Sequence, residues 1–207
     1  MNVKQDSFIV RIISRRDFLL AGSAIAAGMY LGVGEVNAKS IQSKALTQGV
    51  TDKDREFMRI AIQKMRQAGV VDKTGGPFGA VIALNGEVVA ATGNSVIRDH
   101  DPSAHAEVNA IREACRKLGR VELSGATLYS SCELCPMCYA TAYWARVDKV
   151  FYAASWSDYD DLFDDKKESQ DMAKHYPQRK LAPRQILHDE AKKVWEEFRK
   201  LPDGARY

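Results

Sequence analysis

The chain lacks strong net charge, internal repeats and, beyond one run near its start, long apolar stretches. Its formal net charge of +3 over 207 residues is too small to argue for a nucleic-acid partner. The absence of repeats argues against an array of small units. The composition that remains, 45% hydrophobic and 28% charged, is ordinary for a globular protein and indicates one domain with or without an appendage.

The first residues predict an export signal that is removed after Ala38. An apolar, Gly/Ala-rich run from Phe18 to Gly34 follows a basic segment, and Val36 and Ala38 fit the small-residue rule for signal cleavage. The stretch "SRRDFLL" resembles a twin-arginine signal, the address of a translocon that carries folded proteins. The alternative is a chance arginine pair before an uncleaved anchor, for which the run is short and Gly-rich.

This interpretation divides the chain into a signal peptide at residues 1–38, a flexible lead-in at 39–51 and a folded domain at 52–207. It predicts a soluble protein in the periplasm or otherwise exported, with no membrane contact after signal removal. An oxidising compartment favours disulfides, whereas the cysteine spacing described below is typical of a metal site. Folding and metal loading in the cytoplasm before export would reconcile the two.

Helical and strand patterns alternate along the domain. Thr51 is positioned to cap the first helix, with Asp54 in a capping-box position, and Asn85-Gly86 is a typical hairpin turn between two β-branched runs. The predicted elements are a helix at 51–69, a hairpin at 75–94, a helix at 103–119, a strand at 126–131, a helix at 136–146, a strand at 148–155 and a helix at 188–201. This order predicts an α/β fold, a mixed sheet with helices on both faces.

Some expectations concern single residues in these helices. Ser103 is expected to cap the second helix, and Cys115 and Leu118 are expected in its buried stripe. The C-terminal helix is expected to bury its apolar face, including Val194 and Trp195. The acidic stretch at 158–175 is expected to form a loop and then a short helix.

Three cysteines lie three residues apart in "SSCELCPMC" and predict a metal site. If Pro136 begins the helix, Cys135 is its N-cap and Cys138 lies in its first turn, so both sulfurs point off the helix N-terminus. The helix dipole stabilises thiolates at that end. Cys132 precedes the turn and is expected to remain outside the ligand set.

The segment "HAE" supplies the third ligand and an acid/base group. His105 is expected in the first turn of its own helix, one strand before the cysteine helix, so both helix N-termini meet at one edge of the sheet. Three ligands leave the fourth zinc position for water, as in catalytic sites, and Glu107 lies beside it. Alternatives are a surface histidine, a redox cysteine pair, or a structural zinc site that Cys132 closes.

The H-x-E…C-x-x-C constellation resembles the zinc-dependent cytidine deaminase superfamily. Within it, "GGPFGAVI", "HAEVNAIREAC", "LYSSCELCPMC" and "YWARVDKVFYAA" most resemble guanine deaminases. The resemblance covers residues 52–207 and implies a three-layer α-β-α fold with a mixed sheet of about five strands. One departure is Leu134, where the superfamily has a proline before the first ligand cysteine; its loss removes a stiff approach but no ligand.

The family mechanism implies hydrolysis by a zinc-activated water. Glu107 takes the proton of this water and passes it to a ring nitrogen and then to the departing ammonia. Backbone N–H groups after His105, beginning at Ala106, lie near the developing charge. For guanine, the products would be xanthine and ammonia, and the cofactor would be Zn²⁺.

Four further residues are expected to contact the base. Asn94 matches a base-binding asparagine of the family, Phe78 can stack on the ring, and Tyr207 resembles a C-terminal tyrosine that covers the pocket in relatives. Asp165 would accept hydrogen bonds from guanine, although Asp164 competes for this role. The alternatives are a turn asparagine, core packing for the ring, a disordered tail and a solvated acidic loop.

The favoured function is therefore that of a guanine deaminase with a small-molecule substrate, a homodimer as relatives commonly are, and no nucleic-acid partner. A deaminase of another purine, a pterin or a triazine would use the same chemistry. A tRNA adenosine deaminase shares the site, but the near-neutral chain and the acidic segment beside the pocket argue against it. A zinc-stabilised binding module is the non-enzymatic alternative.

Overall fold

The computed structural model describes residues 49–205. The export signal, most of the lead-in and Tyr207 lie outside the described residues. The helices are α2 (Asp52–Arg66), a π-helical turn (Gln67–Val71), α3 (Val96–Asp99), α4 (Ala106–Leu118), α5 (Pro136–Trp144), α6 (Asp165–Met172), α7 (His188–Lys200) and two 3-10 turns (Trp156–Asp158 and Tyr176–Gln178). None of the described helices is both long and apolar enough to cross a membrane.

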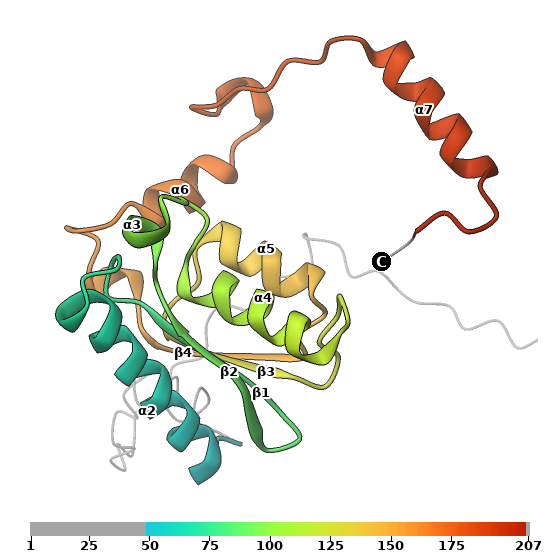
Figure 1. Ribbon diagram of the computed structural model, residues 1–207. Helices are drawn as coiled ribbons and strands as arrows, with labels where there is room; N and C mark the ends of the chain where they lie inside the picture. The colour runs from blue at the N-terminus through green and yellow to red at the C-terminus, as the bar shows by residue number, and fades with distance from the viewer. Residues whose placement is uncertain (1–48, 206–207) are drawn as a thin grey trace, which may run out of the picture. The chain divides into compact units, whose positions relative to one another are not determined.

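Four strands form one mixed sheet in the order β2-β1-β3-β4 (Figure 1). They are β1 (Gly79–Leu84), β2 (Glu87–Gly93), β3 (Thr127–Cys132) and β4 (Lys149–Ala154). β1 pairs antiparallel with β2 and β3, whereas β3 and β4 are parallel. This confirms the predicted fold class.

The strand count differs from the expected five. After β4 the chain enters a charged stretch that folds into short helices, and residues 182–187 have no regular secondary structure. β4 therefore forms an edge of the sheet within the described residues. Pro183, which has no N–H to donate to a ladder, lies in that irregular segment.

The hairpin between β1 and β2 turns at the predicted dipeptide. Asn85 and Gly86 have φ values of 52° and 79°, the left-handed conformation that both central residues of a tight type I′ turn need. The register of the pair shifts between Ile82 and Ala83, which marks a local irregularity.

The strand β1 is buried on both faces because helices cover both sides of the sheet (Figure 1). Ala80 and Ile82 pack in a cluster with residues of α4 and α5, whereas Val81 packs in another with α2. A Cβ at Gly79 would lie 2.2 Å from the carbonyl oxygen of Ala61, so only glycine permits this approach of α2 to the sheet. The result is the predicted three-layer arrangement.

The first helix begins as predicted but ends later. The hydroxyl of Thr51 accepts a hydrogen bond from Asp54 N at 3.1 Å, and Thr51 N donates to the Asp54 carboxylate at 2.7 Å, a complete capping box. At the other end, the helix continues through Gly69 as a π-helical turn to Val71. A Cβ at Gly69 would meet Pro77 at 2.5 Å, so this glycine serves packing rather than termination.

Three other expectations about helices are wrong. The N-cap of α4 is His105 and not Ser103, because the turn Asp101–Ala104 places the histidine directly before the helix. Leu118 is 38% exposed, since it lies in the last turn of α4 beyond the edge of the core. The apolar face of α7 does not pack on the described chain: Trp195 is 60% exposed.

Candidate active site

The turn between β3 and α5 places two cysteines at one helix start. Cys135 is the N-cap of α5 and has an extended backbone, Pro136 occupies the first turn, and Cys138 follows one turn into the helix. Leu134, where the superfamily has proline, is 9% exposed and packs in the core with α4 and α5. Burial of this side chain anchors the approach to Cys135 in place of a rigid ring.

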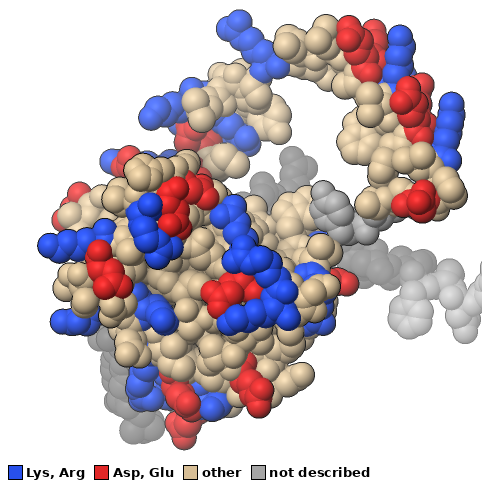
Figure 2. Space-filling view, in the orientation of Figure 1, with Lys and Arg blue, Asp and Glu red and all other residues tan. Residues whose placement is uncertain are grey.

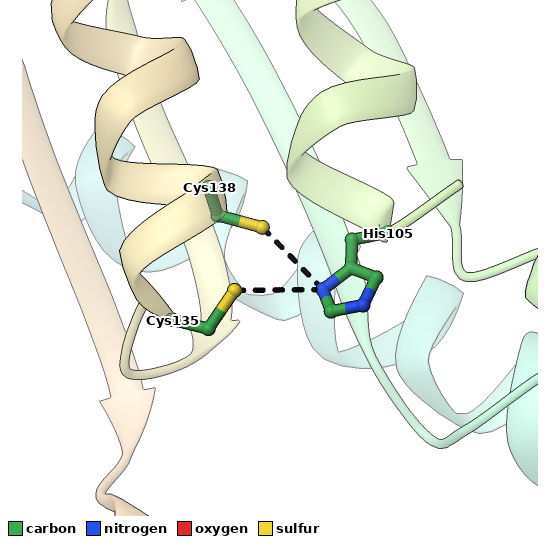
Figure 3. Close-up of side chains that lie close together, drawn as sticks. All are labelled: His105, Cys135 and Cys138. Atoms are coloured by element: carbon green, nitrogen blue, oxygen red, sulfur yellow. Dashed lines mark hydrogen bonds between the residues drawn. The ribbon is translucent and has the colours of Figure 1, made fainter. Parts of the chain in front are cut away.

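The imidazole of His105 points at both sulfurs (Figure 3). Its Nδ1 lies 3.7 Å from the Sγ of Cys135 and 3.5 Å from the Sγ of Cys138. These three atoms all lie within 4.8 Å of one another. Among the described residues, no other group of one histidine nitrogen and two cysteine sulfurs does so. Two helix N-termini therefore converge, as the sequence predicts.

Glu107, in the first turn of α4, reaches the same point from inside the fold. Its side chain is 4% exposed. Its Oε2 accepts from the Cys138 thiol at 3.3 Å, and its Oε1 accepts from the Ser130 hydroxyl at 2.5 Å. The carboxyl is thus held beside the cysteine cluster by hydrogen bonds to both oxygens.

Burial and hydrogen bonding shift the pKa values of this cluster in different directions. A hydrogen bond from Cys138 lowers the pKa of Cys135 to about 4 against the opposing effect of burial. The same contact and burial raise the pKa of Cys138, while the hydrogen bond to Cys135 raises that of His105. Burial raises the pKa of Glu107 although Ser130 and Cys138 oppose it. The thiolate form of Cys135 is therefore favoured at the point where a metal ion would bind.

Cys132 does not belong to this cluster. It ends β3, is 1% exposed, and its Sγ accepts from the hydroxyl of Ser131 at 3.6 Å. Burial raises the pKa of its thiol to about 11, so it stays protonated at neutral pH. Cys115 is half-buried and packs against the core.

A cavity of about 230 Å³ opens onto the cluster. Its lining includes three predicted base contacts, Asn94, Phe78 and Asp165, together with the His105, Glu107, Cys135 and Cys138 side chains. Ala106 does not line it; this residue is fully buried, and its carbonyl accepts from Thr92. The structure therefore brings together the predicted metal ligands, Glu107 and these three base contacts around one cavity, whereas the predicted role of Ala106 concerns its backbone N–H and not its side chain.

The two neighbouring aspartates differ in position. Asp165 begins α6, lines the cavity, and has a pKa raised by burial and by the nearby Cys135 thiolate. Asp164 is exposed and forms an ion pair with Lys167 at 2.6 Å. Of the two, only Asp165 faces the cavity.

Sequence reasoning missed Glu133, Phe163 and Ile97, which also line the cavity. Phe163 packs edge-on against Phe78 with ring centroids 4.9 Å apart, and a Cβ at Gly76 would lie 2.7 Å from the Phe78 ring. The glycine pair before "PF" was the one sequence signal of this packing, because a side chain at Gly76 would collide with the rings of Phe78 and Phe163. A Cβ at Gly75 would likewise lie 1.9 Å from Asn94 Oδ1.

A larger cavity of about 520 Å³ lies elsewhere, between α2, β2 and α4. Among the predicted site residues it contains only Asn94. Four of its charged lining residues form two ion pairs, Arg98 with Asp99 and Arg112 with Asp101. The smaller cavity is therefore the candidate active site, because it contains nitrogen and sulfur atoms that can bind a metal beside the buried Glu107 carboxyl.

Comparison with known proteins agrees with this geometry. Residues 51–154 match the cytidine and deoxycytidylate deaminase zinc-binding region. The chain belongs to this family. A guanine deaminase of Bacillus subtilis is 51% identical over 100 residues, covering 46% of this chain and 64% of that protein. A tRNA-specific adenosine deaminase of Agrobacterium fabrum is 43% identical over 98 residues, covering 47% and 63%.

A solved structure agrees over a longer stretch. The X-ray structure of the Bacillus subtilis guanine deaminase has a TM-score of 0.70 and 38% identity, covering 74% of this chain and 98% of that one. The matched sequence segment spans less than two thirds of either curated relative. Family membership confirms the resemblance to the zinc-dependent cytidine deaminase superfamily that the motifs indicate.

The metal of this family is zinc, and the residues present fit it. Zinc prefers nitrogen and sulfur donors, and three protein ligands are typical where the fourth position serves catalysis. The cluster offers one imidazole nitrogen and two sulfurs, one of them already favoured as thiolate. No further histidine or cysteine joins this group among residues 49–205.

Proposed function

We propose that the protein hydrolyses guanine to xanthine and ammonia. The observation that carries this proposal is the buried Glu107 carboxyl beside a cluster of His105, Cys135 and Cys138, at the base of a cavity of about 230 Å³. The similarity to the Bacillus subtilis guanine deaminase, in sequence and in structure, supports the choice of substrate.

In the proposed mechanism, His105, Cys135 and Cys138 would hold zinc, which would supply an activated water at neutral pH. Glu107 takes one proton from the attacking water and delivers it to a ring nitrogen. It then takes the remaining proton from the hydroxyl group added to the ring carbon and delivers it to the amino group, which departs as ammonia as the carbonyl forms. Burial raises the pKa of Glu107, which favours a carboxyl that holds a proton between the two transfers. The backbone N–H of Ala106, at the start of α4, would lie near the developing charge.

We propose that four side chains recognise the base. Asn94 Oδ1 accepts from Val96 N at 3.0 Å, which leaves its amide nitrogen to donate to a purine acceptor. Phe78 stacks on the ring, and Tyr207 covers it. Asp165 accepts from the ring N–H and amino group that guanine presents on one edge, a pattern that adenine lacks.

The first test is ammonia release from a panel of nucleobases. Guanine should be turned over faster than adenine and cytosine. Glu107→Gln should keep the zinc content and lower kcat by about 100-fold or more, because the amide cannot carry the proton. Zinc is measured by inductively coupled plasma spectrometry. Equal turnover of adenine would contradict guanine specificity, and an active Glu107→Gln protein would contradict the mechanism.

The second test separates the two aspartates. Asp165→Asn should lower kcat/KM for guanine by about 10-fold to 100-fold, because a charged acceptor for two donors is lost. Asp164→Asn, one residue away and exposed, is the matched control and should stay near the unchanged protein. Steady-state kinetics on guanine checks both. Equal losses in the two variants would remove Asp165 from base recognition.

A tRNA adenosine deaminase is the second candidate, because relatives with that activity share the motif region. Lys and Arg are interspersed with Asp and Glu on the face in Figure 2, rather than gathered as a basic track for a phosphate backbone. We therefore propose that nucleic acid is not a partner. Salt-sensitive binding of labelled tRNA, with adenosine turnover above that of guanine, would reverse this choice.

We also propose a homodimer and export. The exposed apolar residues of the C-terminal segment, among them Ile186, Val194 and Trp195, would be covered by a second copy. Residues 1–38 would serve as a twin-arginine signal that delivers the loaded protein to the periplasm, with residues 39–51 as lead-in and 52–207 as the deaminase domain. Fractionation of cells that express the full chain, before and after Arg15→Lys with Arg16→Lys, tests the route.

A further inference from the structure

The hydroxyl of Ser130 is the polar side chain closest to the Glu107 carboxyl. Ser130 lies on β3, 23 residues from Glu107, and is fully buried. Its Oγ donates to Glu107 Oε1 at 2.5 Å. Short hydrogen bonds between a hydroxyl and a carboxyl oxygen are among the stronger ones in proteins, and burial strengthens them further.

The direction of this hydrogen bond is fixed by the backbone. Cys132 N lies 3.4 Å from Ser130 Oγ and donates to it, so the serine oxygen accepts on one side and its proton points to Glu107 on the other. The hydroxyl therefore cannot rotate away without losing a buried partner. Loss of such a partner costs more than the hydrogen bond itself gains.

The two carboxyl oxygens of Glu107 consequently have different surroundings. Oε1 is occupied by Ser130 on β3, whereas Oε2 lies 3.3 Å from the Cys138 sulfur, and Glu107 lines the cavity. A carboxyl attached through rotatable bonds would otherwise exchange its two oxygens. Holding one oxygen on the sheet side leaves the other to handle the proton.

We propose that Ser130 is a positioning residue that holds the Glu107 carboxyl in the orientation required for proton transfer. This inference rests on the proposed function. Ser130 touches neither the cavity nor the metal-binding cluster. It acts through Glu107, so its loss should lower kcat while substrate and zinc still bind.

The adjacent serine provides a matched control. Ser131 is also buried on β3, but its hydroxyl accepts from Gly79 N at 2.9 Å and makes no contact with Glu107. Ser131→Ala therefore removes an equal volume and a structural hydrogen bond from the same strand. It should lower the free energy of unfolding and leave kcat within threefold of the unchanged enzyme.

The experiment measures kcat, KM and zinc content for Ser130→Ala, Ser130→Thr and Ser131→Ala in the full chain. Ser130→Ala should lower kcat on guanine by about 10-fold to 100-fold, with KM within threefold and zinc content unchanged. Ser130→Thr keeps the hydroxyl and should restore most of kcat. If Ser130→Ala does not fold, kcat is compared between Ser130→Thr and Ser130→Val. These two side chains are nearly equal in volume, and only threonine has the hydroxyl.

The outcomes separate this inference from the proposed function. If the unchanged enzyme deaminates guanine and Ser130→Ala matches Ser131→Ala in kcat, the positioning role is wrong and the function stands. If another base is the substrate, kcat of the variants is compared on that base, because Glu107 would transfer the proton in the same way for each ring. A Ser130→Val protein as active as Ser130→Thr would also overturn the inference.

Discussion

At the scale of single residues, neighbours in the sequence perform different tasks. Cys132 and Cys135 are three residues apart, yet one is a buried thiol at the end of β3 and the other caps α5 beside His105. The difference arises because the chain turns between them, from strand direction into a helix start. Ser130 and Ser131 show the same effect, since alternate strand residues face opposite sides of the sheet.

The division between the cysteines predicts the zinc content of serine variants. Cys132→Ser should bind as much zinc as the unchanged protein, because its protonated thiol lies outside the cluster. Cys135→Ser should lose most of its zinc, since a hydroxyl replaces a thiolate ligand. The zinc content of each variant is measured after gel filtration in a weak chelator, which removes loosely bound metal. Equal loss of zinc in both variants would indicate a closed site with four ligands.

At the scale of elements, the helix starts determine the site. The N-caps of α4 and α5 are the residues His105 and Cys135 themselves, and neither makes a side-chain capping hydrogen bond. Their side chains are thereby free to point off the helix ends toward one another. In α2, by contrast, Thr51 and Asp54 are used for capping, and Tyr129 on β3 donates to Asp54 at 2.5 Å.

This contact predicts a pH-dependent stability. Burial tends to raise the pKa of Asp54, but hydrogen bonds from Thr51 and Tyr129 outweigh it and lower the pKa. A lowered folded-state pKa stabilises the fold above the unfolded value of about 3.9, and this contribution is lost as pH falls through the folded value. Asp54→Asn should therefore cost about 1–2 kcal/mol at pH 7 and much less near pH 3.

Urea denaturation of both proteins at the two pH values measures this difference. The comparison is between variant and unchanged protein at each pH, so loss of zinc in acid affects both alike. Tyr129→Phe is the companion variant, because it removes one donor and keeps the ring that stacks with Phe151. A destabilisation by Asp54→Asn that is the same at pH 3 and pH 7 would contradict the assignment.

At the scale of the whole molecule, the C-terminal segment differs from the rest. α2, α4 and α5 bury residues against the sheet, whereas α7 has no buried residue and exposes Val194 and Trp195 by more than half. An amphipathic helix with an uncovered apolar face is unfavourable in water. A second copy of the chain would remove that face from solvent, which is the basis of the proposed dimer.

The dimer proposal predicts the effect of truncating one side chain. Trp195→Ala should weaken dimerisation by about 30-fold or more, because large aromatic residues dominate interface energetics. Lys193→Ala is the matched control on the opposite side of α7, where consecutive residues differ by about 100°. Sedimentation velocity over a dilution series gives both constants. A chain that stays monomeric at every concentration, or equal effects of the two variants, would contradict the proposal.

Much of this protein follows from local sequence. Thr51 with Asp54, Asn85 with Gly86, and Cys135 with Pro136 each define a cap or turn through contacts within a few residues, so the hairpin and the starts of α2 and α5 could be predicted. The zinc-binding motif followed for the same reason, because two of its side chains lie within one helical turn. Local spacing did not reveal Ser130, Glu133 or Phe163.

What only the tertiary structure decided are the contacts between distant segments. Ser130 meets Glu107 across 23 residues, and Phe163 meets Phe78 because the chain returns after β4 to the start of β1. The exposure of α7 was mispredicted for a related reason: its periodicity specifies an apolar face but not which surface covers it. Periodicity and capping are short-range effects, whereas partner choice depends on how the whole sheet and its helices pack.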